Sequence, residues 1–320
     1  MSACGRAQAH RTTFIKESTS PIKKGLQFTR IHARPTFQLV TAMAHRRAWH
    51  AKSCDLEENG KWMESLNWIE DKVQPTGTEA RGWTAEEFVR LVFECEPRVA
   101  VFDCDGTLWG GDAGLGFMTW SLEQGLVSRN TSDWIDNRYR AYRAGQVSEL
   151  EICGEMVQIY AGLREQELRA AAERYFDEFV RPNIFPEMVA LVAALKKADV
   201  TLWAVSSTNR WVVAEGARAF GIPQERVLAA EVRVQAGVIT SELVDVPTDE
   251  GKAIALKRVG LPHPDAVFGN SLHDLAMLEL ARCPFPVNPS PALIEEAAER
   301  GWGYFRPAAA AQFEAAVGGE

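Results

Sequence analysis

The sequence predicts an α/β fold, a doubly wound parallel sheet into which an all-helical cap domain is inserted. Three observations support this prediction. The apolar run 99–102 leads directly into a cluster of aspartates, which is typical of a buried strand that ends at a site. From 186 onward, short apolar runs alternate with stretches of helical periodicity, which indicates parallel strands covered by helices on both faces. Between these regions, over 113–183, apolar residues recur at helical spacing and no clear strand interrupts them.

The composition indicates a soluble globular protein. With 320 residues, 46% of them hydrophobic and 24% charged, the chain can bury the core of one large domain or of a domain with an insertion. No run approaches the ~18 consecutive apolar residues of a membrane span, and the N-terminus lacks the apolar core of a secretory signal. The six cysteines form no CxxC pair, which favours a reducing compartment. We therefore expect a cytoplasmic location and no membrane partner.

Charge is distributed unevenly along the chain. The net charge is −8, yet residues 1–52 hold ten Lys or Arg and a single acid. The acidic remainder argues against a nucleic-acid partner, because affinity for the phosphate backbone comes from basic surface. The basic leader fits an RNA-binding arm, an organellar transit peptide, a disordered extension, or an upstream start codon chosen in error with Met43 or Met63 as the true start. We favour the last two interpretations over the first two, and we expect residues 1–80 to be a basic, disordered extension.

The organised chain is expected to consist of a core and a cap. The core would comprise 81–112 and 184–310, and the cap would comprise about four helices over 113–183. Beyond Pro186 the pattern predicts five helices and four strands, with a hairpin that turns at Ala236-Gly237. The expected helices are 186–198, 210–219, 250–259, 272–281 and 290–300, and the expected strands are 200–206, 226–230, 265–269 and 285–287.

Polar residues follow several of the predicted strands. Because ligands of open α/β sheets bind outside the carboxyl ends of the strands, these side chains should converge at one edge. They are Asp103 and Asp105 after the first strand, Ser206, Ser207 and Asn209 after the next, and Asn270, Ser271 and Asp274 after a later one, with Lys252 at the start of a helix between them. Carboxylates, hydroxyls and one amine are the groups that bind a phosphate together with a hard cation.

Four short motifs in this set resemble those of a known family. They are DCDGTL (103–108), VSS (205–207), GKA (251–253) and GNSLHD (269–274). In this order they resemble the motifs of the haloacid dehalogenase superfamily, and the helical insertion after the first motif is similar to the cap of its phosphoserine-phosphatase-like branch. The resemblance covers about 84–306. It implies Mg²⁺-dependent hydrolysis of a small phosphorylated metabolite, with phosphoserine as the best single candidate.

The resemblance also implies a role for each motif residue. Asp103 would attack phosphorus and form an aspartyl-phosphate, and Asp105 would act as general acid and then as general base. Lys252 would neutralise the nucleophile and the transferring group. The phosphate and substrate would contact Thr107, Asp112, Ser206 and Ser207. Mg²⁺ would be held by the Asp103 side chain, the Asp105 backbone carbonyl and Asn270, with Asp274 in the outer shell.

Asn270 departs from the family pattern, which has an aspartate at this position. An amide oxygen still binds Mg²⁺, but the loss of one negative charge should weaken the metal site; a tenfold loss would be ~1.4 kcal/mol. Two other functions stay open, and Asn270 motivates the first of them. One is a catalytically silent protein that binds a phosphorylated ligand, and the other is a phosphotransferase that passes the phosphoryl group to an acceptor other than water.

Residues near the motifs allow two interpretations. Asp112 stands nine positions after Asp103, where phosphoserine phosphatases carry an acid for the substrate's amino group, but a surface acid in a glycine-rich loop is equally consistent. Three tryptophans could form an aromatic cage for a quaternary ammonium group or, as we favour, pack within the core and the cap: Trp109, Trp120 and Trp134. Three arginines suit a carboxylate clamp or, as we favour, a solvated face: Arg138, Arg140 and Arg143. We expect His273 at the pocket edge and Cys104 in the packed core.

Overall fold

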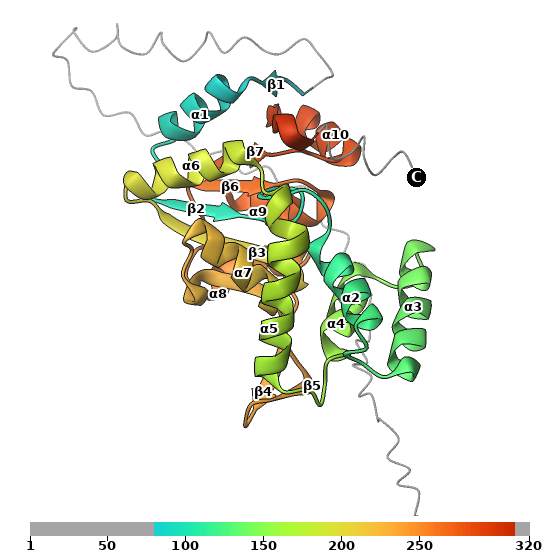
Figure 1. Cartoon of the computed structure of the whole chain (residues 1–320). Coiled ribbons are helices and arrows are strands. Elements are labelled where there is room, and N and C mark those ends of the chain that lie inside the picture. The colour runs from blue at the N-terminus through green and yellow to red at the C-terminus, as the bar shows by residue number, and fades with distance from the viewer. Residues whose placement is uncertain (1–79, 311–320) are drawn as a thin grey trace, which may run out of the picture. The chain divides into compact units, whose positions relative to one another are not determined.

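The computed structural model describes residues 80–310, which belong to one compact unit (Figure 1). The predicted N-terminal extension, with its basic arm and alternative start sites, lies outside the described residues except for its last position. No helix within 80–310 has the length and apolar character needed to cross a bilayer. The cytoplasmic location stays a prediction.

A six-stranded sheet lies at the centre of the unit, with the strand order β5-β4-β3-β2-β6-β7. Neighbouring strands pair in parallel, except that β4 and β5 are antiparallel. The strands are β2 (Val99–Phe102), β3 (Thr201–Asn209), β4 (Val227–Gln235), β5 (Val238–Asp245), β6 (Ala266–Gly269) and β7 (Cys283–Pro286). A separate two-stranded sheet pairs β1 (Gly82–Trp83) with β8 (Tyr304–Phe305). The predicted doubly wound parallel sheet is confirmed.

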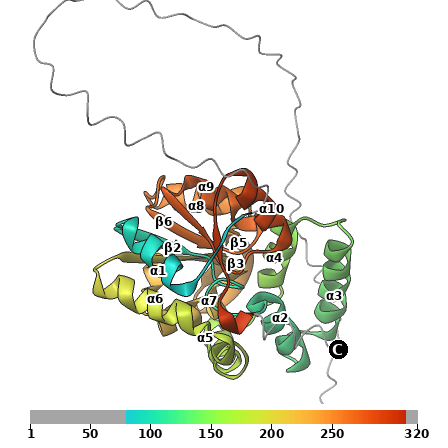
Figure 2. The same ribbon diagram turned by 90° about the horizontal axis from the view of Figure 1, so that it is seen from above.

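Helices cover both faces of this sheet (Figure 2). The bounds are α1 (Ala85–Glu94), α6 (Pro186–Lys197) and α7 (Arg210–Phe220) on one face, and α8 (Glu250–Arg258), α9 (Leu275–Leu280) and α10 (Pro291–Glu299) on the other. Strand periodicity assigns alternate residues to the two layers. Phe102 packs in the core cluster that contains α1, α6 and α7, whereas its neighbour Val101 packs against α8, α9 and α10. The strands are therefore buried on both faces.

The segment between β2 and α6 is helical. It contains α2 (Ala113–Glu123), α3 (Arg129–Arg143), α4 (Glu149–Gln158) and α5 (Glu165–Tyr175), followed by one turn of π-helix over Phe176–Val180. Local capping sets where α2, α3 and α4 begin, because Asp112, Ser128 and Ser148 each accept a hydrogen bond from a first-turn N–H. Figure 1 shows α2, α3 and α4 beside the sheet. We call 113–183 the inserted segment; its division from the core as a separate domain stays a prediction.

The structure changes some predicted elements. The strand expected over 200–206 continues to Asn209, with an irregular register between Ser206 and Asn209 where the chain enters the site. The helix expected over 272–281 begins with a 3₁₀ turn at Leu272–Asp274 before α9. The hairpin turn at Ala236-Gly237 is confirmed, with both residues at positive φ.

A disulfide joins Cys95, at the end of α1, to Cys283 in β7. The sequence reasoning did not predict this pair, because 188 positions separate the two cysteines. Cys104 is buried in the core, as expected, and Cys104 and Cys153 are free thiols.

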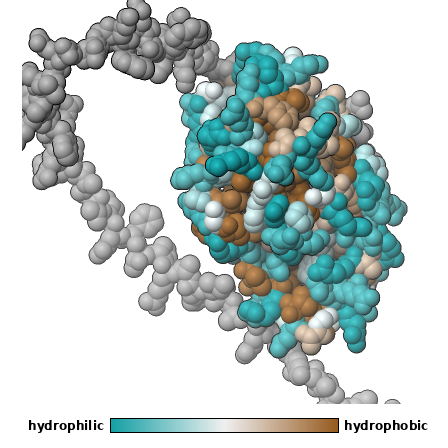
Figure 3. Space-filling model, turned by 90° about the vertical axis from the view of Figure 1, so that its left-hand side faces the viewer, coloured by the Kyte–Doolittle hydropathy of each residue, from teal (hydrophilic) through white to brown (hydrophobic). Residues whose placement is uncertain are grey.

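Hydrophilic residues cover most of the face shown in Figure 3, with apolar patches between them. Apolar side chains left on the surface include Val189, Val244 and Ile254. Scattered exposure of this kind is normal for a folded chain and marks no site by itself.

Replacing Phe102 should destabilise the fold strongly. Its ring stacks on Phe268 of the neighbouring strand, with 4.4 Å between ring centroids, and both side chains are fully buried. We expect Phe102→Ala to lower the free energy of unfolding by about 3 to 5 kcal/mol through lost transfer energy and a residual cavity. Urea unfolding measures this change. Phe93→Ala, at an exposed phenylalanine of α1, is the control and should cost about 1 kcal/mol or less; equal losses would contradict the packing described here.

Candidate active site

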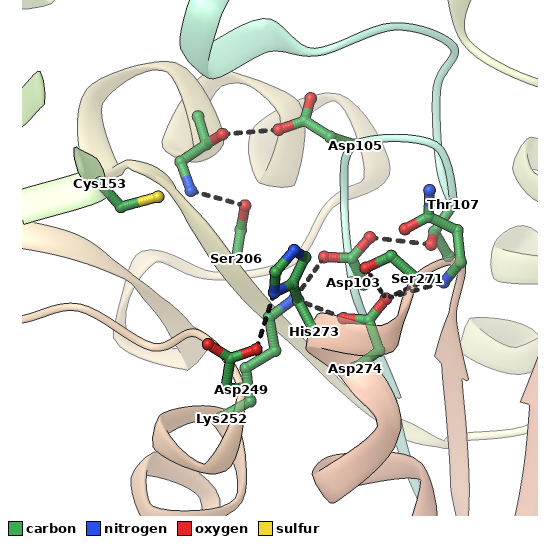
Figure 4. A network of polar contacts seen from close by, with 12 residues as sticks. Asp103, Asp105, Thr107, Cys153, Ser206, Asp249, Lys252, Ser271, His273 and Asp274 are labelled. Atoms are coloured by element: carbon green, nitrogen blue, oxygen red, sulfur yellow. Dashed lines mark hydrogen bonds and ion pairs between the residues drawn. The ribbon is translucent and has the colours of Figure 1, made fainter. Parts of the chain in front are cut away.

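The carboxyl ends of β2, β3 and β6 meet the beginning of α8, and their polar side chains converge there (Figure 4). The chain after β2 is tied to β6, because the Asp103 N–H donates to the carbonyl of Phe268 at 2.9 Å. The structure therefore brings together the residues of all four motifs. Parallel pairing of the three strands is the cause, since it puts their carboxyl ends at one edge.

A buried ammonium group links two of the aspartates. Lys252 Nζ donates to Asp103 Oδ1 at 2.7 Å and to Asp274 Oδ1 at 2.5 Å, and all three side chains are less than a tenth exposed. The remaining oxygens have partners as well. Thr107 Oγ1 donates to Asp103 Oδ2 at 2.9 Å, and Asp274 Oδ2 accepts from the N–H of Asn270 at 2.8 Å. Figure 4 shows this network.

Burial sets the protonation of this network. Burial and the nearby charge of Asp274 raise the pKa of Asp103, against the lowering effect of Lys252. Burial also opposes the charge of Lys252, but the two carboxylates outweigh it and raise the pKa of the ammonium. Lys252 is therefore held as a cation between the two carboxyl groups.

Asp105 has a different environment from Asp103. Its Oδ1 accepts from the indole Nε1 of Trp109 at 2.6 Å and from the N–H of Ala113 at 2.8 Å, and its Oδ2 accepts from Thr208 Oγ1 at 2.6 Å. Burial raises the pKa of Asp105, and these hydrogen bonds oppose that rise. The carboxyl group is thus held in one orientation by neutral donors.

Sequence reasoning missed the roles of Trp109 and Thr208. Trp109 is fully buried and packs edge-on against Phe176 at 5.9 Å between ring centroids. Packing was the favoured interpretation of this residue, but its indole also positions Asp105. Thr208 follows the VSS motif directly, and the hydroxyl at the end of that strand was the available signal. Of the motif serines, Ser207 lines the pocket, whereas Ser206 is buried and its Oγ accepts from the N–H of Thr208 at 3.2 Å.

A cavity of about 300 Å³ lies over these groups. Asp105, Lys252 and Asn270 line its core side. The inserted segment supplies much of the opposite wall, with Tyr139, Tyr142, Arg143, Glu149 and Cys153, and Asp112, just before the segment, adds to this wall. Such a cavity accommodates a phosphate group and a small organic substituent.

Asp112 combines the two interpretations considered for it. Its Oδ1 accepts from the N–H of Leu115 at 2.8 Å and caps α2, while the residue also lines the cavity. Desolvation by the surrounding protein raises the pKa of Asp112 to about 6, and the negative charges of Asp105 and Glu149 raise it further. Asp112 therefore has a structural role and also faces the space where a substrate would lie.

Other predicted residues lie in varied settings. Arg138 donates to both carboxylate oxygens of Glu155 and Arg140 to Asn137, so only Arg143 of the three arginines faces the cavity. Trp120 packs on Phe117. His273 lines the cavity edge, as expected, and its Nδ1 lies 2.7 Å from Asp249 Oδ1.

The oxygen groups of the site fit a hard cation. Within residues 80–310, no group of three or more His, Cys, Asp or Glu side chains is arranged to hold a metal ion. Besides the Asp103 side chain and the Asp105 carbonyl, the expected ligand is therefore the amide of Asn270. Gly106, at φ +75°, makes room for that amide, because a Cβ there would lie 1.9 Å from the Asn270 side-chain nitrogen. Mg²⁺ accepts carboxylate and amide oxygens as ligands. The site also holds three carboxyl groups, from Asp103, Asp105 and Asp274, against the single positive charge of Lys252.

The family model of haloacid dehalogenase-like hydrolases matches residues 100–279, more than half of the chain. The chain belongs to the haloacid dehalogenase-like hydrolases. The predicted family membership is confirmed, and so is the prediction of a hydrolase.

Several known proteins are similar to this hydrolase. A histidinol-phosphatase from Neisseria meningitidis serogroup C (strain 8013) is 25% identical over 64% of this chain and 96% of the relative. A probable phosphatase from Mycobacterium tuberculosis is 28% identical over 63% of this chain and 73% of the relative. The crystal structure of a protein of unknown function from Bordetella pertussis Tohama I matches with a TM-score of 0.59 at 25% identity, covering 65% of this chain and 98% of that one.

A probable phosphoserine phosphatase from Vibrio cholerae has a TM-score of 0.51 at 15% identity, covering 70% of this chain and 67% of that one. At this identity the likeness concerns the fold, and it agrees with the predicted resemblance to phosphoserine-phosphatase-like members of the family.

Gly106→Ala should impair the activity of this hydrolase, because the new methyl group would displace the Asn270 amide. We expect kcat/KM for p-nitrophenyl phosphate with Mg²⁺ to fall by about tenfold to a hundredfold, as for other small misplacements of reacting groups. Gly125→Ala is the matched control: Gly125 has a similar φ of +69°, but a Cβ there meets nothing within 4 Å. Equal effects of the two variants would mean that backbone strain, and not contact with Asn270, limits position 106.

Asp112→Asn should change how stability depends on pH. Because the pKa of Asp112 is raised to about 6, the native state binds more protons than the unfolded chain between about pH 4 and pH 6. The wild type then loses stability as the pH rises through this window. Asn keeps an oxygen for the Leu115 N–H but carries no charge, so the variant should be the more stable protein above about pH 6, with the difference vanishing toward about pH 4.

Urea unfolding at unit pH steps, without added metal, measures the effect of Asp112→Asn. Asp136→Asn, at an exposed aspartate of α3, is the control and should give no such trend. A stability difference for Asp112→Asn that is the same at every pH would show that its charge is not disfavoured in the folded protein.

Proposed function

We propose that this hydrolase cleaves small phosphomonoesters through an aspartyl-phosphate on Asp103. The observation that carries the proposal is that two aspartates with different partners lie at the carboxyl edge of the sheet, where Asp103 is buried and the half-buried Asp105 lines the cavity. Asp103 is bound by the Lys252 ammonium and the Thr107 hydroxyl, whereas Asp105 is bound by neutral donors. Membership of a hydrolase family and the names of the two relatives, histidinol-phosphatase and probable phosphatase, support it.

In the first step, an Asp103 oxygen attacks phosphorus and the bond from phosphorus to the ester oxygen breaks. Asp105, whose pKa burial raises, donates a proton to the leaving oxygen. In the second step, Asp105 takes a proton from a water molecule that attacks the aspartyl-phosphate. Inorganic phosphate leaves and the Asp103 carboxylate is restored. Trp109 and Thr208 keep the Asp105 carboxyl in one orientation through both proton transfers.

Charge must be neutralised when an anionic ester approaches Asp103. At ~4 Å two unit charges repel by about 4 kcal/mol at the effective dielectric of a protein surface. Lys252 Nζ is placed 2.7 Å from Asp103 to offset this repulsion. Mg²⁺ would be held by the Asp103 side chain, the Asp105 carbonyl and the Asn270 amide oxygen, with Asp274 positioned behind them. When bound, the cation supplies charge stabilisation to the phosphoryl oxygens.

Two substrates are candidates for this site. Phosphoserine follows from the resemblance of the motifs, and histidinol phosphate follows from the name of the relative from Neisseria. Both are phosphate esters that carry an amine, and Asp112 faces the cavity that would hold it. The phosphotransferase alternative would use the same first step with a different acceptor in the second.

Asp103→Asn should abolish turnover, since an amide is a poor nucleophile. We expect kcat for p-nitrophenyl phosphate in Mg²⁺ to fall by at least about 10³-fold, as for other enzymes that lose a nucleophile, and chelation of Mg²⁺ to reduce wild-type turnover. With this substrate Asp105→Asn should slow the second step more than the first, because p-nitrophenolate leaves without needing a proton, so that intact-mass spectrometry detects a phosphorylated chain.

The control for these variants is Asp133→Asn, at an exposed aspartate of α3, which should keep wild-type rates. Turnover retained by Asp103→Asn would refute the nucleophile. A wild-type protein that binds phosphate esters without turnover would support the silent-protein alternative that Asn270 suggests.

A further inference from the structure

The segment that follows β7 contacts both of the loops that would hold the cation, although it lies outside the four motifs. It consists of Asn288, Pro289 and Ser290, and we call it the 288–290 segment. The Ser290 N–H donates to the main-chain carbonyl of Asn270 at 2.8 Å, and Asn288 Nδ2 donates to the carbonyl of Gly106 at 3.3 Å. Because β7 pairs in parallel with β6, this segment begins at the same edge of the sheet as the site.

The backbone of Gly106 needs contacts of this kind, because glycine has no side chain to restrict its conformation. Its N–H donates to the Trp109 carbonyl at 2.7 Å, and this N–H shares one planar peptide unit with the carbonyl of Asp105. The direction of the Asp105 carbonyl, an expected cation ligand, therefore depends on how Gly106 is held. The bond to Trp109 lies within one short stretch of chain, whereas the bond from Asn288 comes from beyond a different strand. Asn288 thus ties this stretch to the end of β7.

A second partner orients the amide of Asn288. Its Oδ1 accepts from Arg306 Nη1 at 3.4 Å, so that Nδ2 faces the Gly106 carbonyl. The reverse orientation would place an NH₂ group against the guanidinium and an oxygen against a carbonyl oxygen. A side chain that ends in both a donor and an acceptor satisfies the two neighbours at once.

The other expected ligand, Asn270, is held on both sides of its backbone. Its N–H donates to Asp274 Oδ2 at 2.8 Å, and its carbonyl accepts from the Ser290 N–H. The two loops touch, because a Cβ on Gly106 would lie 1.9 Å from the side-chain nitrogen of Asn270. One short segment therefore holds both loops at the place where they meet.

We propose that Asn288 and the Ser290 N–H position the two cation ligands: they hold Gly106 and Asn270, and so keep the Asp105 carbonyl and the Asn270 amide in place. This inference rests on the proposed function for the nature of the site, and it adds Asn288 as a positioning residue. Asn288 does not line the cavity, so it acts through Gly106 and not on the substrate. Groups that hold metal ligands from behind typically change metal affinity by about 10- to 100-fold.

Binding of Mn²⁺ to the full chain tests this proposal without turnover. Mn²⁺ takes the same oxygen ligands as Mg²⁺, and electron paramagnetic resonance measures the free ion. Asn288→Gly deletes the donor, and glycine adopts the φ of +46° at this position without strain. We expect the Kd for Mn²⁺ to rise by about tenfold, which corresponds to ~1.4 kcal/mol. At saturating metal, kcat for p-nitrophenyl phosphate should stay within about threefold of the wild type, because the reacting side chains keep their own partners.

Glu96→Gly is the matched control. Glu96 has the same φ of +46° and also precedes a proline, but it lies before β2, at the opposite end of that strand from the site. The Kd for Mn²⁺ should stay within about twofold in this variant, because distant sites act independently.

Asn288→Ala separates the lost donor from backbone strain. Alanine lacks the donor, as glycine does, but it is strained at positive φ. We expect the same rise in Kd as for Asn288→Gly, together with unfolding at a lower urea concentration. A loss of affinity that follows the loss of stability would show a merely structural role and overturn the assignment.

Ser290→Pro and Ser290→Ala test the second contact. Both remove the hydroxyl that caps α10, but only proline removes the N–H that donates to Asn270, and the φ of −59° at Ser290 suits proline. We expect the Kd for Mn²⁺ to rise by about tenfold in Ser290→Pro and to stay within about twofold in Ser290→Ala. If circular dichroism shows that the Asn288 variants do not fold, this pair decides, and equal Kd values for the two would overturn the proposal.

The failure of this inference is distinguishable from the failure of the proposed function. Turnover by the wild type with an unchanged Kd in Asn288→Gly overturns the positioning role alone. A wild type that binds Mn²⁺, with weaker binding in Asn288→Gly but no turnover of any phosphate ester, refutes the phosphatase and supports the positioning role. A wild type that binds no Mn²⁺ overturns the positioning role whatever its turnover.

Discussion

The site depends on the buried contact of Lys252 with Asp103 and Asp274. One ammonium group from α8 joins two carboxylates, one that follows β2 and one that follows β6. Without this cation the two acids would be buried as unpaired charges, which costs several kcal/mol per ion. The contact is possible because parallel strands end at one edge of the sheet and α8 begins at the same edge. The ion network thus couples the chemistry of the site to the pairing of the sheet.

The two aspartates of the first motif show how environment separates roles. Asp103 and Asp105 are two positions apart in the chain, yet one contacts a cation and the other contacts an indole, a hydroxyl and a backbone N–H. A carboxylate held by a permanent cation is suited to nucleophilic attack. A carboxyl group held by neutral donors with a raised pKa is suited to proton transfer. The proposed mechanism assigns the two roles on this difference.

Residues from two parts of the chain line the cavity. The core supplies the groups that act on phosphate, and the inserted segment supplies much of the wall that would contact the rest of a substrate. Asp112 lies where the two meet, as the N-cap of α2 and as a wall residue. Because the wall residues come from a segment that contributes little to the central sheet, they can differ between relatives without disturbing the catalytic groups.

The sequence by itself determined the doubly wound sheet and the residues gathered at its carboxyl edge. Strand burial on both faces, helical spacing and turn residues such as Ala236-Gly237 are local patterns, and motif order then placed Asp103, Lys252 and Asp274 at one edge. Only the tertiary structure decided which donors hold Asp105, since Thr208 lies 103 positions away. It also decided that Cys95 bonds to Cys283 and that Glu149 faces His273. These contacts could not be predicted from the sequence because backbone preferences act over a few residues, whereas the contacts depend on how whole helices and strands pack.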